Sequence, residues 1–475
     1  MHHVVYTIFG ATGDLSYRKL MPAFYNLFSR GLVKDTAIFL ALGRRDWTRD
    51  EYLAEIEPWV RKFARFPVSD ASFAAFAAHI DYLQIDFVDS TEYQRLFAYY
   101  DEKHWRDGEP TRYLFYFSVA PRFFPVIADN LLNTGCLRGE CRVIIEKPFG
   151  SNLDEAREIT NKLSAAFGMK QIYHIDHYLG KEMVQNISTL RHNNAVFRAA
   201  WDRHSIDSVQ ISALEEIDIG SRGAYYDETG ALKDMIRGHL FQILTIVAME
   251  DVENIDSPEF QQSQEDLLLA LRAPDDDIGS QLVLGQYEGY RDTKEVADNS
   301  NTETYAALRV WIDNERWRGV PFYLRSGKAL KERKTFVTIN FRKNGDVGTA
   351  DRLHIEIQPQ EGIGLSFIIK KPGSRSETTE VNMNFCQSCN LEAHSNTPEA
   401  YERLLFAAYE GQREYFTPWQ QIVSSWKWAH ELRVKRDAAG MVPELYARGS
   451  WGPATAEELL ALSGRSWVNE TETLT

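Results

Sequence analysis

The 475-residue chain has few cysteines, no excess of positive charge and no long apolar run, and each absence excludes a class of protein. Four cysteines in a chain of this length do not make a disulfide framework. A net charge of −15 argues against nucleic acid and anionic membranes as partners, because both need a basic face. No apolar run reaches the roughly 18 to 20 residues that span a bilayer, and the best candidate, 240–249, is expected to be a buried helix.

The beginning of the sequence also lacks the features of a secretion signal. Residues 1–3 run directly into the apolar stretch 4–9, without a basic leader or a small-residue cleavage site. We therefore expect a cytoplasmic protein.

Cys386 and Cys389 form a CxxC pair with His394 shortly after it. Half a zinc site and a redox pair are both conceivable, but zinc needs further ligands, and Cys136 and Cys141 have the wrong spacing for a second CxxC. The sequence favours two reduced thiols near a strand end and predicts no metal site.

The chain is longer than one hydrophobic core usually supports, and its pattern changes after Lys181. Before that point, nearly continuous apolar runs at 4–9, 37–42, 113–119 and 143–145 alternate with helical patterns, which is typical of a doubly wound parallel sheet. After it, helical patterns are interleaved with alternating runs, which indicate an antiparallel sheet covered by helices. The predicted fold is α/β plus α+β, with a Rossmann-like domain at 1–177 and a larger domain at 178–475.

The first apolar run ends in Gly10-Ala11-Thr12-Gly13-Asp14-Leu15. Two glycines after a buried strand permit a tight turn and let backbone amides approach a phosphate at the next helix. This is not the full G-x-G-x-x-G fingerprint, and an ordinary strand-to-helix turn is the alternative.

The second apolar run ends in Gly43-Arg44-Arg45, where an enzyme that prefers NAD usually has a carboxylate. Arginine accommodates a 2′-phosphate, so the pattern favours NADP, with NAD use also possible. A solvated strand edge is the alternative reading.

A dense polar cluster, made of His174, Asp176, His177, Tyr178 and Lys181, follows the apolar pair at 172–173. Open α/β sheets bind ligands at such strand ends. Lys147 stands at the end of the preceding strand, and a cis bond to Pro148 would aim it into the same crevice.

The second half holds two further candidate segments. Asp234 and His239 lie in the polar lead-in to the apolar helix. Lys328, followed by Lys331, Arg333 and Lys334, forms a basic cluster suited to a phosphorylated substrate. Taken alone, each is more often a satisfied core residue or a solvated face.

Together these segments resemble the glucose-6-phosphate dehydrogenase family over nearly the whole chain. The resemblance rests on Gly10-Ala11-Thr12-Gly13-Asp14-Leu15 with Arg18-Lys19, Ser118-Val119-Ala120-Pro121-Arg122-Phe123-Phe124, Glu146-Lys147-Pro148-Phe149-Gly150, Ile175-Asp176-His177-Tyr178-Leu179-Gly180-Lys181-Glu182, Gly230-Ala231-Leu232 through His239, and Pro321-Phe322-Tyr323-Leu324-Arg325-Ser326-Gly327-Lys328.

The resemblance implies oxidation of glucose 6-phosphate at C1 by NADP, the first step of the pentose phosphate pathway, in a homodimer or homotetramer. By position, His239 resembles the general base and Asp176 the carboxylate that orients it. The residues that match substrate-binding positions are Lys147, His177, Tyr178, Lys181, Glu215, Asp234, Lys328 and Arg333. Those that match cofactor-binding positions are Gly10, Ala11, Thr12, Gly13, Asp14, Leu15, Lys19, Arg44 and Lys147.

The chain departs from the family pattern at three places. Arg237-Gly238 precedes His239 where the family usually has Gln-Asn, Arg333 stands where a lysine is common, and His174 where an arginine is usual. The first departure leaves open a sugar-phosphate-binding homologue with altered substrate or lost catalysis. A third reading makes His174, Asp176, His177 and His239 ligands of a hydrolytic metal.

Overall fold

The computed structural model describes residues 3–33, 36–102, 111–252, 257–343, 350–387 and 398–469. The chain forms two compact units, the first from Met1–Gly180 with Pro398–Thr417, and the second from Lys181–Thr397 with Pro418–Thr475. The predicted domain boundary, between residues 177 and 178, lies three residues before the point where the chain passes from the first unit to the second. The return of 398–417 to the first unit was not expected from the sequence.

The first unit is built on a six-stranded sheet in the order β3-β2-β1-β4-β5-β6. Every adjacent pair is parallel. This order is that of a doubly wound dinucleotide-binding fold, which confirms the predicted fold class of the first half. The strands are β1 (His3–Phe9), β2 (Ile38–Gly43), β3 (Ile80–Gln84), β4 (Thr111–Phe117), β5 (Glu140–Glu146) and β6 (Ile172–Ile175).

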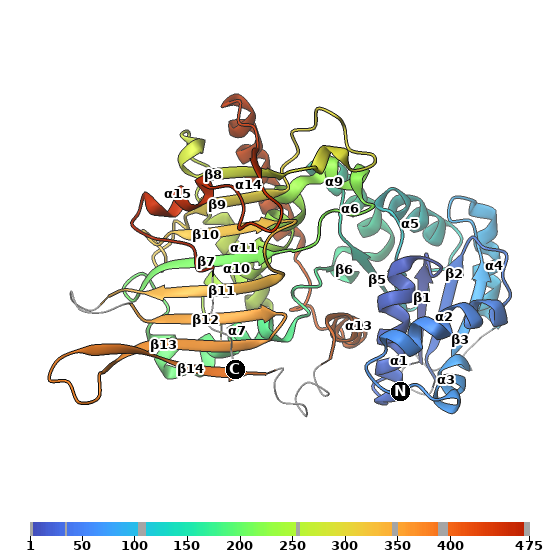
Figure 1. Ribbon diagram of the computed structural model, residues 1–475. Coiled ribbons are helices and arrows are strands. Elements are labelled where there is room, and N and C mark those ends of the chain that lie inside the picture. The colour runs from blue at the N-terminus through green and yellow to red at the C-terminus, as the bar shows by residue number, and fades with distance from the viewer. Residues whose placement is uncertain are drawn as a thin grey trace. The chain divides into compact units, whose positions relative to one another are not determined.

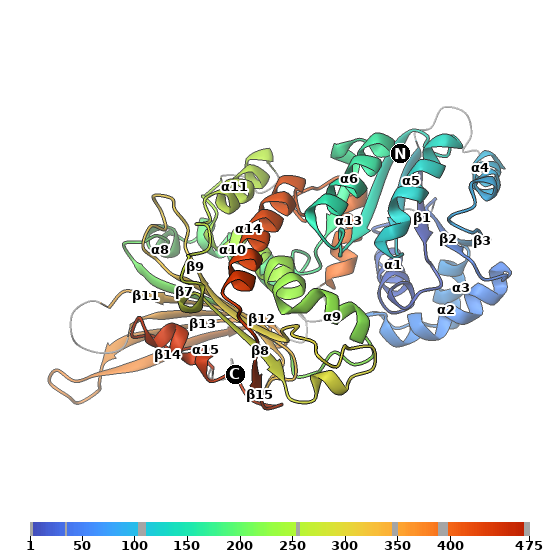
Figure 2. The same cartoon turned by 90° about the horizontal axis from the view of Figure 1, so that it is seen from above.

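Helices cover both faces of this sheet, α1 to α3 on one face and α4 to α6 on the other (Figure 2). The helices are α1 (Met21–Ser29), which follows a π-helical turn at Ser16–Leu20, α2 (Arg49–Phe63), α3 (Asp70–Ala77), α4 (Tyr93–Glu102), α5 (Phe124–Asn133) and α6 (Leu153–Phe167). Both faces are therefore apolar, which explains why β1 and β2 are almost continuously buried.

The returning segment adds one more α-helix, α13 (Ala400–Glu410), to the first unit. Its apolar side chains Leu404 and Leu405 are fully buried in the same core as α1 and β1. At its polar edge, Arg65 pairs with the buried Glu402 at 2.7 Å. The sequence pattern shows that this helix is amphipathic but not which sheet it covers.

The second unit is built on a nine-stranded sheet in the order β14-β13-β12-β11-β7-β10-β9-β8-β15. The predicted antiparallel sheet is confirmed, with two parallel pairs, β10 with β7 and β15 with β8. The strands are β7 (Ile206–Leu214), β8 (Leu282–Tyr287), β9 (Tyr305–Val310), β10 (Phe322–Gly327), β11 (Lys334–Phe341), β12 (Arg352–Gln358), β13 (Gly362–Lys370), β14 (Thr378–Cys386) and β15 (Glu444–Tyr446).

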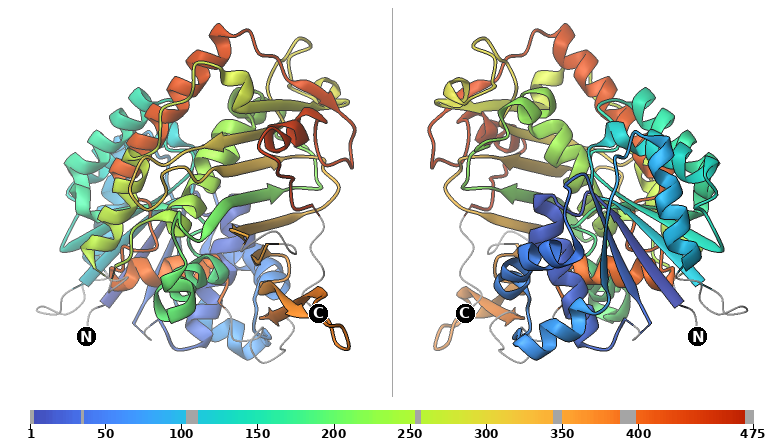
Figure 3. Two further views of the ribbon diagram at one scale, coloured as in Figure 1. Left: turned by 90° about the vertical axis from the view of Figure 1, so that its left-hand side faces the viewer. Right: turned by 90° about the vertical axis from the view of Figure 1, so that its right-hand side faces the viewer.

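Helices cover one face of this sheet, with α7, α10, α11 and α14 behind it in Figure 1, while α15 packs on the opposite face (Figures 1 and 3). The helices are α7 (Glu182–Asn193), α8 (Ala195–Ala199), α9 (Gly223–Ala231), α10 (Phe241–Ala248), α11 (Pro258–Leu269), α14 (Trp419–Ala438) and α15 (Thr455–Ala461). Of the helices in the described ranges, none is both long enough and apolar enough to cross a membrane.

The apolar helix expected over 240–249 is the last part of a longer helical stretch that begins after a break. The backbone kinks at Gly230, continues as a π-helical segment η5 (Leu232–Leu240), and only then becomes α10. All of α10 is buried, as predicted for the apolar run.

The cysteines differ in state. Cys136 and Cys141 are free thiols. Cys386 at the end of β14 is disulfide-bonded, contrary to the expected reduced thiol. Cys389 and His394 lie outside the described residues.

Candidate functional site

The glycine turn after β1 is closed by short backbone contacts. Gly10 has a φ of +79°, and a Cβ there would lie 2.1 Å from the Ser118 carbonyl oxygen, which excludes any side chain. The amides of Gly10 and Ala11 donate to the Leu42 carbonyl at 3.1 and 3.0 Å. A helical run begins at Asp14, between the ends of β1 and β4, where the strand order reverses. This geometry fits the pyrophosphate of a dinucleotide at a helix N-terminus.

Arg44 follows β2 and is exposed, without an ion pair to any residue in the described ranges. Its neighbour Arg45 lies over the Trp47 ring at 4.6 Å, and its backbone carbonyl accepts a 2.7 Å hydrogen bond from the Tyr82 hydroxyl. The Arg44 guanidinium can therefore turn toward a ligand phosphate. Lys19, on the π-helical turn before α1, lies 3.5 Å from Glu399.

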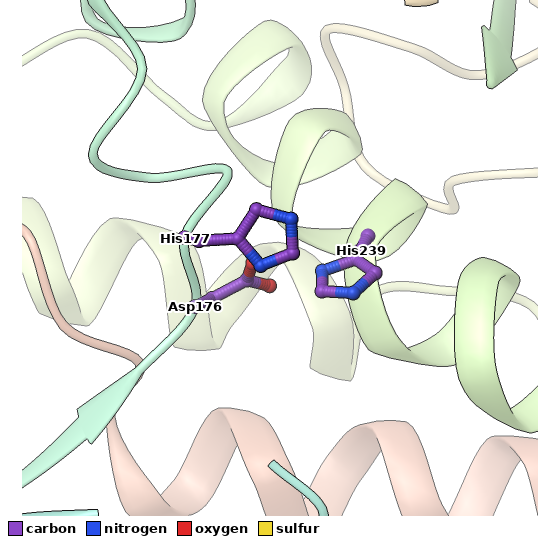
Figure 4. A group of neighbouring side chains, drawn as sticks. All are labelled: Asp176, His177 and His239. Carbon is purple, nitrogen blue, oxygen red and sulfur yellow. The ribbon is translucent and has the colours of Figure 1, made fainter. Parts of the chain in front are cut away.

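The polar cluster after β6 is organised by a buried carboxylate. The Asp176 side chain is fully buried. It forms an ion pair with the Lys147 ammonium at 2.5 Å and accepts a 3.0 Å hydrogen bond from the Tyr178 amide. The Lys147-Pro148 bond is cis, as the sequence suggested. Figure 4 shows Asp176 and His177 on the chain just beyond the end of β6.

Glu146 precedes Lys147, and the sequence analysis assigned it no role. Its carboxylate accepts hydrogen bonds from the hydroxyls of Tyr116 and Tyr401, the latter at 3.2 Å. Burial raises the pKa of Glu146 to about 7. Tyr401 lies on the returning helix α13, so only the folded chain shows this group.

His174 differs from its neighbours because its side chain belongs to the core. It is 2% exposed and meets the Phe149 ring edge-on at 4.9 Å. Burial, with Arg413 nearby, lowers the pKa of His174 to about 3, so the ring is neutral at physiological pH. A packed core residue is a poor candidate for a metal ligand.

In the second unit, Asp234 and His239 both lie on η5. His239 is 8% exposed and stands near the end of this segment (Figure 4). Asp234 lies in the first turn and accepts a 3.3 Å hydrogen bond from the Tyr225 hydroxyl of α9. Isolated π-helical turns occur frequently at functional sites, which suits a segment that carries two predicted site residues.

Lys328 and Glu215 meet at the ends of the parallel strands β10 and β7. Their side chains form an ion pair, and the Glu215 amide donates to the Gly327 carbonyl at 3.0 Å. Burial lowers the pKa of Lys328 to about 8. The pair places a cation and an anion at the carboxyl ends of two central strands, both of which η5 contacts.

The remaining predicted residues of the second unit are less enclosed. The Lys181 ammonium donates to the Gln358 side-chain oxygen at 2.7 Å, and Arg333 is exposed. Arg237, the departure beside His239, lies over the Trp426 ring of α14 at 3.8 Å. Its charge is therefore held against an aromatic face of its own unit.

Comparison with known families decides the assignment. Residues 7–186 match the model "Glucose-6-phosphate dehydrogenase, NAD binding domain", and residues 188–468 match "Glucose-6-phosphate dehydrogenase, C-terminal domain". The chain belongs to the glucose-6-phosphate dehydrogenase family. The resemblance drawn from the motifs is thereby confirmed, and the cofactor is a nicotinamide dinucleotide.

Relatives of this dehydrogenase match it over nearly their full length. It is 34% identical to glucose-6-phosphate 1-dehydrogenase of Bacillus subtilis, over 98% of each chain. It is 36% identical to that of Chlamydia muridarum, over 98% of this chain and 96% of the relative. A solved glucose-6-phosphate dehydrogenase in complex with glucose 6-phosphate is 31% identical, with a TM-score of 0.91 and 98% of each chain covered.

The predicted site residues of the dehydrogenase divide between the two units. The first unit carries the glycine turn with Lys19, Arg44, Lys147, Asp176, His177 and Tyr178, and the second carries Lys181, Glu215, Asp234, His239, Lys328 and Arg333. Their individual roles stay predictions. The sequence analysis did not single out Glu146, Tyr225 or Tyr401. Each draws attention only through a hydrogen bond to another side chain, and that contact is visible only in the structure.

Proposed function

We propose that this dehydrogenase oxidises glucose 6-phosphate at C1 to 6-phosphogluconolactone, with transfer of hydride to NADP and with NAD as a possible second acceptor. The observation that carries the proposal is the full-length match to an enzyme solved with that substrate. We also propose a cytoplasmic location, as the sequence suggested.

In this proposal, His239 is the general base. As the C1 carbon loses hydride, the C1 hydroxyl must lose its proton, and a histidine titrates near working pH and can accept it. Asp176 would orient the imidazole and stabilise its charged form. The bound nicotinamide supplies the hydride acceptor, so these side chains supply orientation and proton transfer.

The substrate is held by charge and hydrogen bonding. His177, Tyr178 and Lys181 would bind the phosphate, and Lys147, Glu215, Asp234, Lys328 and Arg333 the sugar. The pairing of Lys147 with Asp176 and of Lys328 with Glu215 supports this assignment, because both lysines are fixed before any ligand arrives.

Arg44 would bind the 2′-phosphate that distinguishes NADP from NAD. The support is its exposure and its freedom from ion pairs to the described residues. Arg45 is a weaker candidate, because its guanidinium is stacked on Trp47.

We propose a homodimer or homotetramer that associates through the larger sheet. The edge strand β14 supports this, because Met383 and Phe385 on it are 62% and 58% exposed. Light scattering of wild type and Met383→Asp tests the surface, and an unchanged mass would contradict it.

The first experiment measures initial rates with glucose 6-phosphate and either NADP or NAD, following reduced nicotinamide by absorbance. Saturable turnover supports the proposal. Saturable binding of glucose 6-phosphate without turnover would favour a homologue that has lost catalysis. The stacking of Arg237 on Trp426 argues against that alternative, because it ties the unusual charge to α14.

A further inference from the structure

The segment that carries Asp234 and His239 begins at a break in the helix. Gly230 has φ +65° and ψ 173°, so α9 cannot run on as a regular helix, and η5 starts two residues later. A helix start leaves backbone amides without partners inside the helix. The side chain of Ala231 supplies no acceptor for them.

Glu303, just before β9, supplies the missing acceptors from a distant part of the chain. Its backbone carbonyl accepts from the Ala231 amide at 2.9 Å, and its Oε1 accepts from the Leu232 amide at 3.1 Å. A Cβ on Gly230 would lie 2.4 Å from the same Oε1, so the carboxylate occupies the space that any side chain there would need.

The Glu303 carboxylate is also buried and lies close to a positive charge. The residue is 4% exposed, and its Oε2 lies 3.5 Å from the Arg436 guanidinium of α14. Burial raises its pKa, while Arg436 and Lys233 act in the opposite direction. A carboxylate at a helix N-terminus is favoured by the helix dipole, which also acts against the rise in pKa that burial causes.

We propose that Glu303 is a positioning residue of the dehydrogenase: by capping the first turn of η5, its carboxylate fixes where this segment places Asp234 and His239. The inference rests on the proposed role of His239. A nine-residue π-helical segment is less regular than an α-helix and depends on its ends, and a displacement of about 1 Å at a catalytic group can cost ~10²-fold in rate.

Three variants separate the reach of the side chain from its charge. Glu303→Gln keeps an oxygen within reach of the Leu232 amide but loses the charge. Glu303→Asp keeps the charge near Arg436 but is one methylene too short. Glu303→Ala loses both. A matched control is Asp207→Asn at the start of β7, which breaks an ion pair with Arg465 at 2.7 Å in the same unit.

We expect kcat to fall in the order wild type, Gln, Asp, Ala, with a loss of about 10- to 100-fold for Glu303→Ala and of less than about fivefold for Glu303→Gln. KM for NADP should change little, because the proposed cofactor residues lie in the first unit. Asp207→Asn should retain wild-type kcat. A Glu303→Asp variant that outperforms Glu303→Gln would overturn the proposal, because the charge and not the reach would then matter.

Hydrogen exchange gives a readout that needs no turnover. Deuterium uptake in peptides that cover residues 231–240 should rise in Glu303→Asp and Glu303→Ala, and stay at the wild-type level in Asp207→Asn. Unchanged uptake in both Glu303 variants would refute the capping role. If wild type itself fails to oxidise glucose 6-phosphate, the proposed function fails, and the exchange experiment still decides whether Glu303 caps η5.

Discussion

Gly10 and Gly31 provide a matched pair that tests how closely β1 and β4 approach at the cofactor turn. Both have positive φ, +79° and +65°, and both lie in the first unit. A Cβ at Gly31 would meet nothing within 4 Å, whereas a Cβ at Gly10 would lie 2.1 Å from the Ser118 carbonyl oxygen. Alanine at Gly31 therefore adds only backbone strain, and alanine at Gly10 adds strain and a collision with the main chain.

The expected magnitudes follow from these two contributions. Gly31→Ala should cost about 1 to 2 kcal/mol, the penalty for a Cβ in the left-handed region. Gly10→Ala should cost that amount plus about 1 to 3 kcal/mol for overpacking, since the carbonyl that it meets belongs to the backbone beyond β4 and cannot rotate away. Because the Gly10 turn is also the proposed phosphate site, NADP affinity should fall much more in Gly10→Ala than in Gly31→Ala.

The assay combines calorimetric unfolding of both variants with NADP titration. Hydrogen exchange in peptides from β1 and β4 assigns the loss to the first unit, because a two-unit chain need not unfold in one step. Equal destabilisation by the two substitutions would refute the close approach. Equal NADP affinity would remove the turn from the cofactor site.

Three further substitutions test the site. Arg44→Ala should raise KM for NADP about tenfold or more while leaving KM for NAD nearly unchanged, as expected for loss of a charge-assisted phosphate contact; equal losses for both cofactors would mean that Arg44 does not contact the 2′-phosphate. His239→Asn should lower kcat by about 10² to 10⁴-fold with KM for glucose 6-phosphate within a few fold, because a general base acts in the transition state; near-normal turnover would remove His239 from that role. Glu146 has an ordinary pKa of 4.5 that burial raises to about 7. The folded state therefore holds this proton more tightly, and the resulting stability is complete below pH 4.5 and lost as the pH rises through 7. Glutamine at this position does not ionise. In urea unfolding, the free energy of unfolding of Glu146→Gln should therefore rise relative to that of wild type by up to about 3 kcal/mol between pH 4.5 and 7.5. A difference that does not depend on pH would contradict this.

Local patterns predicted the local structure well. The apolar run after His3 is β1, the glycine turn follows it, and the polar residues from Asp176 onward do follow a strand. These features depend on a few neighbouring residues, so the sequence carries them directly.

Contacts between residues that are far apart in the chain could not be predicted from the sequence patterns. Nothing near Glu303 indicates that its carboxylate meets the amide of Leu232, and nothing near Tyr401 indicates that its hydroxyl reaches Glu146. The break between α9 and η5 at Gly230 has the same origin, because the Glu303 carboxylate, from another part of the chain, occupies the space that a side chain at this position would need.

The return of residues 398–417 to the first unit has a consequence for the order of synthesis. During synthesis, Met1–Gly180 emerges from the ribosome long before α13 is made. Leu404 and Leu405 of α13 nevertheless belong to the core around α1 and β1. Domains generally fold as they emerge, N-terminal first, but the core of this unit is completed by a helix made more than two hundred residues later. During that interval the apolar face beneath α13 is open to chaperones or to aggregation, and a fragment that ends at Gly180 inherits the same exposed face permanently.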